Sequence, residues 1–192
     1  FLLMDEKEEM RREHFDIILD EIERVNNIVE EFMLLAKPKT DLLTVNNINS
    51  IVSNTLSLFM YELKKKKVEL SFTTNIPELL VLCDEQRLKQ VFINFIKNSI
   101  EAMPSGGKLT VTIEKQERFA KIIVADTGIG IPKDKLSKIG DPFFTTKENG
   151  TGLGLMISFE IIQSHKGKLE IDSKENKGTT LTISLPLHKK AV

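Results

Sequence analysis

Hydrophobic residues recur every three to four positions through the first part of the chain. Between residues 5 and 36 they form a heptad-like series with charged residues in between: Phe15, Ile18, Ile22, Val25, Val29, Phe32 and Ala36. This spacing predicts one long helix that packs against other helices in a bundle, with an amphipathic helix lying on its own domain as the alternative. Pro38 disfavours helix at the residue before it, so we expect the chain to change direction there.

The rest of the chain mixes helical and strand-like patterns. Apolar residues at helical spacing predict helices at 47–66, 85–103 and 152–164, the second of them with Asp84 as its N-cap. Alternating or short apolar runs predict strands at 68–74, 79–83, 108–115, 118–126, 168–173 and 179–185. Residues 127–150 are rich in Gly, Pro, Lys and Asp, which predicts a long functional loop such as a lid.

This order of elements predicts an α+β protein with two parts. Residues 1–38 form a helical segment, and residues 39–192 form an α/β sandwich in which a mixed sheet is covered on one face by helices. The 192 residues suffice for one full core plus a smaller appended element.

Composition and charge narrow the classes of partner. With 27 basic and 28 acidic residues the net charge is −1, so we expect no nucleic-acid partner. No apolar run approaches the ~18 residues of a membrane span, so we expect no membrane contact by this segment. The single cysteine, Cys83, fits a reducing, cytoplasmic setting, and its apolar neighbours predict a small buried side chain.

Two segments carry side chains that suit a nucleotide. Asn94 and Asn98 are spaced i, i+4 on a predicted helix, so both amides project from one face. An amide oxygen together with phosphate oxygens suits magnesium. Asp126 ends an apolar strand before Gly128 and Gly130, where its carboxylate can accept a hydrogen bond from an adenine amino group while the glycines allow close backbone approach.

Two further segments, Pro142–Lys147 and Gly150–Leu155, suit the phosphates. The glycines expose consecutive N–H groups at the start of a helix, whose field favours anions, so we expect the polyphosphate here. The segment is not a Walker A loop, because no Lys-Ser/Thr pair follows it. Upstream, Thr146 and Lys147 could reach the outer phosphate, and Phe143 and Phe144 are expected to pin the lid to the core.

Together these segments resemble the N, G1, F and G2 boxes of the catalytic, ATP-binding domain of sensor histidine kinases, over residues 45–188. The resemblance implies ATP and Mg²⁺ as ligands, with Asn98 on the metal and Asn94 as the catalytic residue at the phosphate end. Asp126 would read the adenine, and Gly178–Thr180 would help to order its pocket. The implied nucleotide-binding residues are Asp126, Gly128, Gly130, Ile131, Thr146, Lys147, Gly150, Thr151, Gly152, Leu153, Gly154, Leu155 and Thr180.

Asn94 bears on the type of reaction. In the hydrolases that share this ATP fold, and in the anti-sigma serine kinases, a glutamate occupies its position. An amide is no base, whereas a neutral histidine nitrogen already carries a lone pair and needs none. Asn94 therefore favours phosphoryl transfer to histidine, with an inactive nucleotide-binding interaction module of the same fold as the alternative.

The acceptor histidine is expected outside this chain. His14, His165 and His188 all lack the acceptor pattern of the family, and His165 falls at a helix end that a protonated imidazole would stabilise. Residues 5–36 would then be the second helix of a dimerisation hairpin, and residues 1–4 the end of the first.

The partners follow from the same resemblance. They are a second copy bound through the hairpin, a response regulator that receives the phosphoryl group on an aspartate, and small inhibitory proteins on the hairpin. The Lys37–Pro38 junction, the Pro142–Lys147 segment and the Gly178–Pro186 segment are similar to those of Bacillus-type sporulation kinases. We expect this segment to be cytoplasmic, whether or not its parent is tethered to a membrane.

Overall fold

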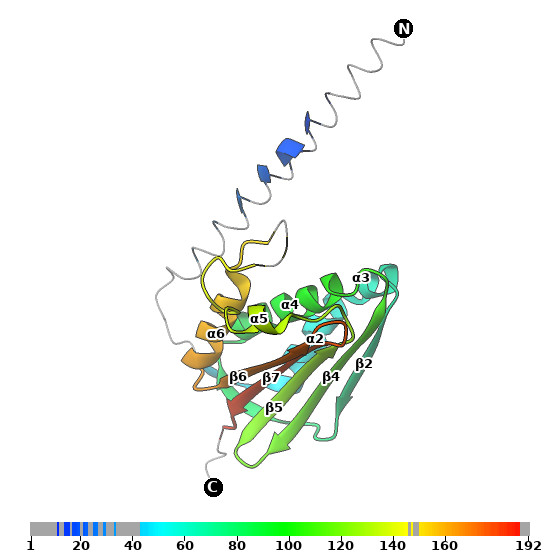
Figure 1. Ribbon diagram of the computed structural model, residues 1–192. Helices are drawn as coiled ribbons and strands as arrows, with labels where there is room; N and C mark the ends of the chain where they lie inside the picture. The colour runs from blue at the N-terminus through cyan, green and yellow to red at the C-terminus, as the bar shows by residue number, and fades with distance from the viewer. Residues whose placement is uncertain are drawn as a thin grey trace.

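The computed structural model describes residues 43–145, 147 and 150–188, together with residues 11, 14, 15, 17–19, 21, 22, 25, 26, 29 and 33. From residue 43 onward the described chain forms two layers, a sheet with helices on one of its faces (Figure 1). This arrangement confirms the fold class predicted from the sequence.

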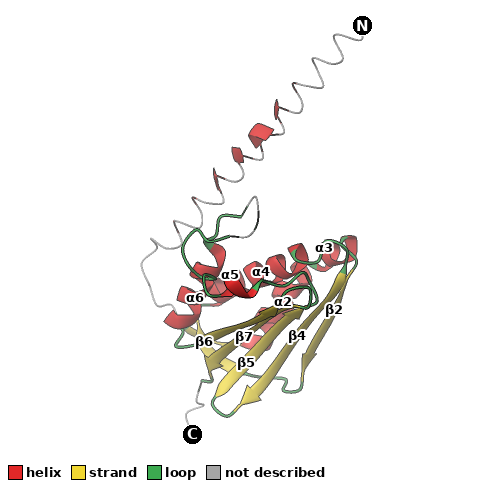
Figure 2. Cartoon of the chain, in the orientation of Figure 1, coloured by secondary structure: helices red, strands yellow, loops and turns green. Residues whose placement is uncertain are grey.

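The main sheet has five strands in the order β2-β4-β5-β7-β6. Their bounds are β2 Val68–Thr74, β4 Gly107–Gln116, β5 Phe119–Asp126, β7 Gly178–Pro186 and β6 Lys168–Lys174. The β2–β4 pair is parallel and the other three pairs are antiparallel, so the sheet is mixed, as predicted (Figure 2). A separate antiparallel pair joins β1 (Thr44–Asn47) to β3 (Leu80–Cys83).

The predicted helix at 47–66 is two helices. The five named helices are α2 Ile48–Leu58, α3 Met60–Lys65, α4 Glu85–Glu101, α5 Lys133–Leu136 and α6 Gly154–Ser164. The Phe59 backbone N–H donates to the Leu56 carbonyl at 3.0 Å, three residues earlier, and α2 ends there. The helix α3 begins at the next residue. Because the apolar spacing continues across this break, the sequence gives no sign of it.

The core lies between the helix layer and the sheet. In α4 the buried side chains recur at helical spacing, and in the central strands every second residue points toward the helices. These residues are Leu88, Val91, Phe92, Phe95, Ile96, Leu109, Val111, Ile113, Ala120, Ile122, Val124, Leu181, Ile183 and Leu185. Asp126 continues the inward series of β5, so the alternation of this strand places the carboxylate on the helix-covered face.

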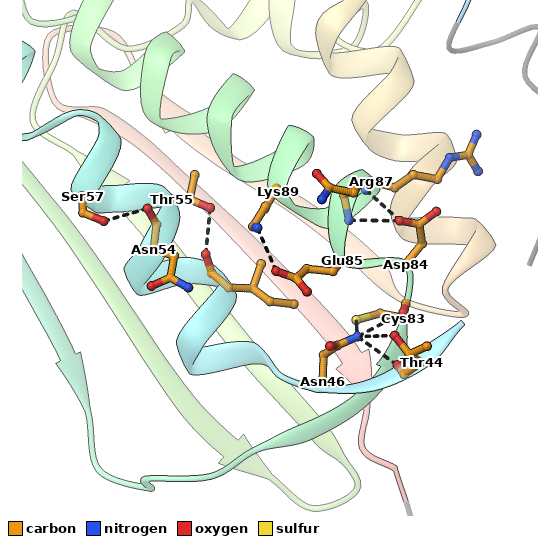
Figure 3. A network of polar contacts seen from close by, with 12 residues as sticks. Thr44, Asn46, Asn54, Thr55, Ser57, Cys83, Asp84, Glu85, Arg87 and Lys89 are labelled. Atoms are coloured by element: carbon orange, nitrogen blue, oxygen red, sulfur yellow. Dashed lines mark hydrogen bonds and ion pairs between the residues drawn. The ribbon is translucent and has the colours of Figure 1, made fainter. Parts of the chain in front are cut away.

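The start of α4 is fixed by Asp84, as predicted. Its Oδ1 atom accepts the backbone N–H groups of Gln86 and Arg87 at 3.0 and 3.1 Å (Figure 3). Such an N-cap satisfies helix-end donors and contributes on the order of 1 kcal/mol. Cys83, immediately before it, is 1% exposed, and burial raises the pKa of its thiol, in agreement with the predicted small buried side chain.

His165 is placed at the end of α6, as predicted. Its Nε2 atom accepts the Asp84 backbone N–H at 2.9 Å, and Nδ1 lies 2.7 Å from the Ile161 carbonyl oxygen. Both ring nitrogens therefore lie within hydrogen-bond distance of backbone groups from two different elements. The buried ring ties the end of α6 to the start of α4.

Two further elements differ from the predictions. The strand β1 has only four residues, Thr-Val-Asn-Asn, without an apolar alternation, and it forms through pairing with β3. The short helix α5 lies inside the predicted 127–150 loop.

No helix in the described part of the chain is long and apolar enough to cross a membrane.

The predicted long helix at 5–36 lies only partly within the described residues. The positions described there are helical, and the described apolar side chains are exposed to between 50% and 65%. They include Phe15, Ile18, Ile22, Val25 and Val29. These side chains are therefore not packed on the chain's own sandwich. Phe32 and Ala36 lie outside the described residues.

Candidate functional site

Asp126 ends β5 as a buried carboxylate with three hydrogen-bond donors. Its Oδ1 atom accepts the backbone N–H groups of Gly128 at 2.9 Å and Thr179 at 3.2 Å, and its Oδ2 atom accepts the Ser99 hydroxyl at 3.2 Å. The side chain is 8% exposed. Burial raises the pKa of the Asp126 carboxyl, and the three hydrogen bonds oppose that rise. The carboxylate is therefore held in a fixed orientation.

The predicted glycines bring other parts of the chain close to Asp126. A Cβ atom on Gly128 would lie 2.5 Å from the Ala102 carbonyl oxygen, and one on Gly178 would lie 1.9 Å from the Asp126 carbonyl oxygen. Gly130 has a φ of +64°, and a Cβ there would lie 2.1 Å from the Lys174 oxygen. These glycines are needed for contact between chain segments, a role that the sequence reasoning, which considered only a ligand, did not foresee.

Ile131 joins this loop to the edge of the sheet. Its backbone N–H donates to the Ser173 hydroxyl at 2.9 Å, and the Ser173 and Thr179 hydroxyl oxygens are 2.9 Å apart. The 128–131 loop is thus held against the β6–β7 turn, beside Asp126.

Thr180, predicted to order the adenine pocket, lies on the face of the sheet away from the helices and from Asp126. It pairs opposite Ala125 in the β5–β7 ladder, whereas the neighbouring Thr179 follows the inward series with Leu181. A shift of one residue in a strand moves a side chain to the other face of the sheet. Thr179 therefore takes the place at Asp126 that the sequence reasoning gave to Thr180.

Asn94 and Asn98 share one face of α4, as predicted, and they are hydrogen-bonded in series. The Asn98 Nδ2 atom donates to Asn94 Oδ1 at 3.1 Å, and Asn94 Nδ2 donates to the Ser158 hydroxyl at 3.0 Å. A Cβ on Gly154 would lie 2.7 Å from Asn94 Oδ1, so a glycine lets α6 begin directly beside α4. Asn94 thereby fixes the position of Asn98 and the first turn of α6.

Lys147 places a positive charge beside Asn98. Its Nζ atom donates to Asn98 Oδ1 at 2.6 Å and also contacts Glu101 Oε2. The Asn98 amide oxygen therefore points to a place where a cation is already held. Among the described residues no group of three His, Cys, Asp or Glu side chains could hold a metal. A single amide oxygen completed by phosphate oxygens and waters is a donor set that Mg²⁺ accepts.

The Gly150–Leu155 segment leads into α6, whose N-terminus has no side-chain cap among the described residues. Leu153 at the N-cap position is 1% exposed, and its backbone N–H lies 3.4 Å from the Thr151 hydroxyl. Gly152 has a φ of +71°, and a Cβ there would lie 2.4 Å from the Phe143 carbonyl carbon. An uncapped N-terminus of an 11-residue helix offers N–H groups and a favourable field to an anion.

Two expectations for the lid are changed or stay open. Phe143 is 64% exposed, so it does not pin the lid to the core through its side chain, although its backbone lies against Gly152; Phe144 is half-buried. Thr146 lies outside the described residues.

Four residues of this region were missed by the sequence reasoning: Ser99, Glu101, Ser158 and Thr179. Each is polar, and its meaning depends on a contact between elements far apart in the chain. The one available signal was the helical spacing of Glu101, three residues after Asn98, which places it on the same face of α4.

The comparisons with known proteins agree with this geometry. Residues 83–189 match the family model described as "Histidine kinase-, DNA gyrase B-, and HSP90-like ATPase". The chain belongs to this family. Sporulation kinase E of Bacillus subtilis (strain 168) is 40% identical over 181 residues, which cover 93% of this chain but 24% of that kinase. This chain thus spans about a quarter of that relative's length.

Solved structures of histidine kinases are similar as well. The catalytic domain of histidine kinase ThkA superposes with a TM-score of 0.69 at 36% identity, covering 75% of this chain and 95% of that domain. A crystal structure of ThkA in complex with the response regulator protein TrrA gives 0.76 at 33% identity, covering 88% of this chain and 49% of that one. The predicted resemblance to sensor histidine kinases, including sporulation kinases, is confirmed.

Proposed function

We propose that this chain binds ATP with Mg²⁺ and transfers the γ-phosphoryl group to a histidine on the dimerisation hairpin of a two-component sensor kinase. The observation that carries this proposal is that α4 takes part in both ends of one site. Ser99 contacts the buried Asp126 carboxylate, while Asn94 accepts a hydrogen bond from Asn98 and donates one to Ser158 in α6. A nucleotide lying along α4 would meet an acceptor for its base and donors for its phosphates.

At the base end, Asp126 accepts a hydrogen bond from the adenine amino group. The Oδ1 atom already accepts two backbone N–H groups, so Oδ2 keeps the remaining acceptor capacity. A 6-oxo purine offers an acceptor at the same position and would oppose the carboxylate. This chemistry favours adenine over guanine or hypoxanthine.

At the phosphate end, the N–H groups of the α6 N-terminus and the glycine segment bind the phosphate oxygens. Asn98 Oδ1 is the protein ligand for Mg²⁺, which supplies charge neutralisation on those oxygens. Lys147 is close enough to Asn98 to exchange its contact for an outer phosphate oxygen. Asn94 acts by holding Asn98 and α6 in register, and it removes no proton.

In the transfer step, a neutral imidazole nitrogen of the acceptor attacks the γ-phosphorus with its lone pair. The new N–P bond forms as the P–O bond to ADP breaks, and ADP leaves with that electron pair. The chain supplies positioning and charge stabilisation, in keeping with an amide at residue 94. The acceptor is a histidine outside this chain, because none of its three histidines lies in the family's acceptor pattern.

The partners belong to the same proposal. Exposed apolar positions such as Phe15, Ile18 and Ile22 support packing in a homodimeric bundle. Because ThkA was crystallised with a response regulator, we propose that a response-regulator aspartate receives the phosphoryl group from the acceptor histidine. Small inhibitory proteins would bind the hairpin, and the segment would work in the cytoplasm.

Calorimetric titration and a transfer assay test the proposal. The chain should bind ADP with Mg²⁺. Asp126→Asn should weaken this binding at least tenfold, because the amide carries no charge and places an NH₂ donor where the adenine amino group needs an acceptor. With radiolabelled ATP, the chain should label an acceptor-containing partner that cannot itself bind ATP, and the label should be acid-labile and alkali-stable. Nucleotide binding without any such label would favour an inactive binding module.

A further inference from the structure

We propose that Ser99 is a positioning residue for adenine recognition. Its hydroxyl donates a hydrogen bond to Oδ2 of Asp126, whereas the backbone N–H groups donate to Oδ1. This inference rests on the proposed function of Asp126 as the adenine acceptor. It adds a residue that the family resemblance did not assign, and it concerns base selectivity rather than phosphoryl transfer.

The two oxygens of Asp126 have different surroundings. Oδ1 accepts two backbone N–H groups, which occupy both of its lone pairs. Among the described residues, the Ser99 hydroxyl at 3.2 Å is the donor to Oδ2, which leaves that oxygen one free lone pair. Because the Ser99 bond occupies one side of Oδ2, it determines which direction remains open to an amino group.

The Ser99 hydroxyl does not follow the usual habit of a buried hydroxyl in a helix. Such groups commonly donate to the carbonyl four residues earlier in their own helix. Thr55 in α2 does so, with its Oγ1 2.7 Å from the Ile51 oxygen (Figure 3), and Ser158 in α6 donates to the Gly154 oxygen at 2.8 Å. The bond of Ser99 instead crosses from α4 to the end of β5.

The neighbouring contacts keep Ser99 in place. Its side chain is 2% exposed, and three residues later the Ala102 carbonyl accepts the Ile129 backbone N–H at 2.9 Å. Gly128 packs directly against Ala102. The end of α4 therefore contacts both the carboxylate and the loop that follows it, so the backbone that carries Ser99 is fixed relative to Asp126.

The bond has two consequences for the base. It restricts rotation of the carboxylate, and as a donor it favours the ionised form, which can only accept hydrogen bonds. Without that donor the carboxyl would be protonated more readily, and a protonated carboxyl could donate to the 6-oxo group of hypoxanthine. Loss of the hydroxyl should therefore reduce discrimination between a 6-amino and a 6-oxo purine, in addition to weakening adenine binding.

Titrations of the whole chain with ADP and with inosine diphosphate, both with Mg²⁺, test this. Ser99→Ala should weaken ADP binding about tenfold, the effect of losing one hydrogen bond to a charged group. Binding of inosine diphosphate should change by less than about threefold, so the ratio of the two affinities narrows. Thr55→Val is the matched control, because it removes a buried helix hydroxyl outside the site and should leave the ratio unchanged.

Three results would decide against Ser99. Unchanged ADP affinity in Ser99→Ala, or equal weakening of both nucleotides, would mean that Ser99 serves packing alone. Should Ser99→Ala unfold, Ser99→Cys keeps a similar volume with a weak donor, and an unchanged affinity ratio in that variant would overturn the inference. If the unaltered chain fails to bind ADP, the proposed function fails, and this inference fails with it.

Discussion

The Asp126 carboxyl is buried, and burial disfavours its negatively charged form. Burial raises the pKa of its carboxyl, so the folded chain binds a proton more readily than the unfolded chain does. A raised pKa in the folded state gives stability that is complete below the unfolded value and is lost as the pH rises through the folded value. At neutral pH the ionised carboxylate therefore lowers the free energy of unfolding, a cost that nucleotide binding would offset.

Asp126→Asn should consequently be at least as stable as the unaltered chain at neutral pH. The amide oxygen can accept the Gly128 and Thr179 N–H groups, and its NH₂ can donate to the Ser99 oxygen, so all three hydrogen bonds are kept without a charge. Thermal unfolding without nucleotide should give a higher midpoint for the variant at neutral pH, and the difference should shrink as the pH falls toward the ordinary pKa of an aspartate, about 3.9. A clear loss of stability at neutral pH would contradict this account of the carboxylate.

Acidification should also weaken ADP binding by the unaltered chain. The decline should begin at a higher pH than an ordinary carboxyl would give, because protonation of Asp126 removes the acceptor. Titrations from neutral to mildly acidic pH measure it, and Asp126→Asn should show a flatter profile. A parallel decline in that variant would mean that another group titrates.

His165 joins α6 to the start of α4 through its buried ring. Substitution with Ala would leave the Asp84 N–H without its acceptor in a buried place and should cost about 1–3 kcal/mol of unfolding free energy. Urea unfolding measures this loss. His188→Ala is the control, because that side chain is exposed and its backbone bond to Leu80 remains. Equal losses in both variants would show that the two hydrogen bonds of the His165 ring add nothing.

At the scale of elements, periodic patterns predicted most strands and helices because burial on one face imposes them. β1 was missed because its four residues have no alternation and depend on pairing with β3. The break at Phe59 leaves the apolar spacing intact, so it has no signature in the sequence. Within the site, Asp126 and the two asparagines were predictable from their contexts, whereas Ser99 and Thr179 depend on contacts between distant elements.

Glu101 of α4 forms an ion pair with Lys147, the last residue of the Pro142–Lys147 segment. That ion pair is partly exposed, so it should contribute no more than about 1 kcal/mol. Glu101→Gln removes a negative charge close to the expected phosphates and frees Lys147 to reach them. ATP binding without magnesium should therefore become about two- to fivefold tighter, as measured by titration in the presence of a chelator.

The control for Glu101 is Glu114→Gln. Glu114 pairs with Lys121 at 3.6 Å on strands β4 and β5, and both side chains belong to the outward series of those strands, away from Asn98. That variant should leave ATP binding unchanged. Equal effects in the two variants, or weaker binding in Glu101→Gln, would mean that Glu101 does not restrain Lys147.

At the scale of the whole molecule, the sandwich from residue 43 onward has its own core, whereas the described apolar positions before it are exposed. A chain that begins at residue 43 should therefore keep its ADP–Mg²⁺ affinity within about twofold and fold cooperatively. It should not associate in sedimentation experiments and should not label an acceptor-containing partner. It lacks the exposed apolar positions that are proposed to pack in the bundle: Phe15, Ile18, Ile22, Val25 and Val29. Loss of ADP binding in the shortened chain would show that the first 42 residues help to build the site. Undiminished labelling would show that the sandwich reaches its acceptor without the first 42 residues.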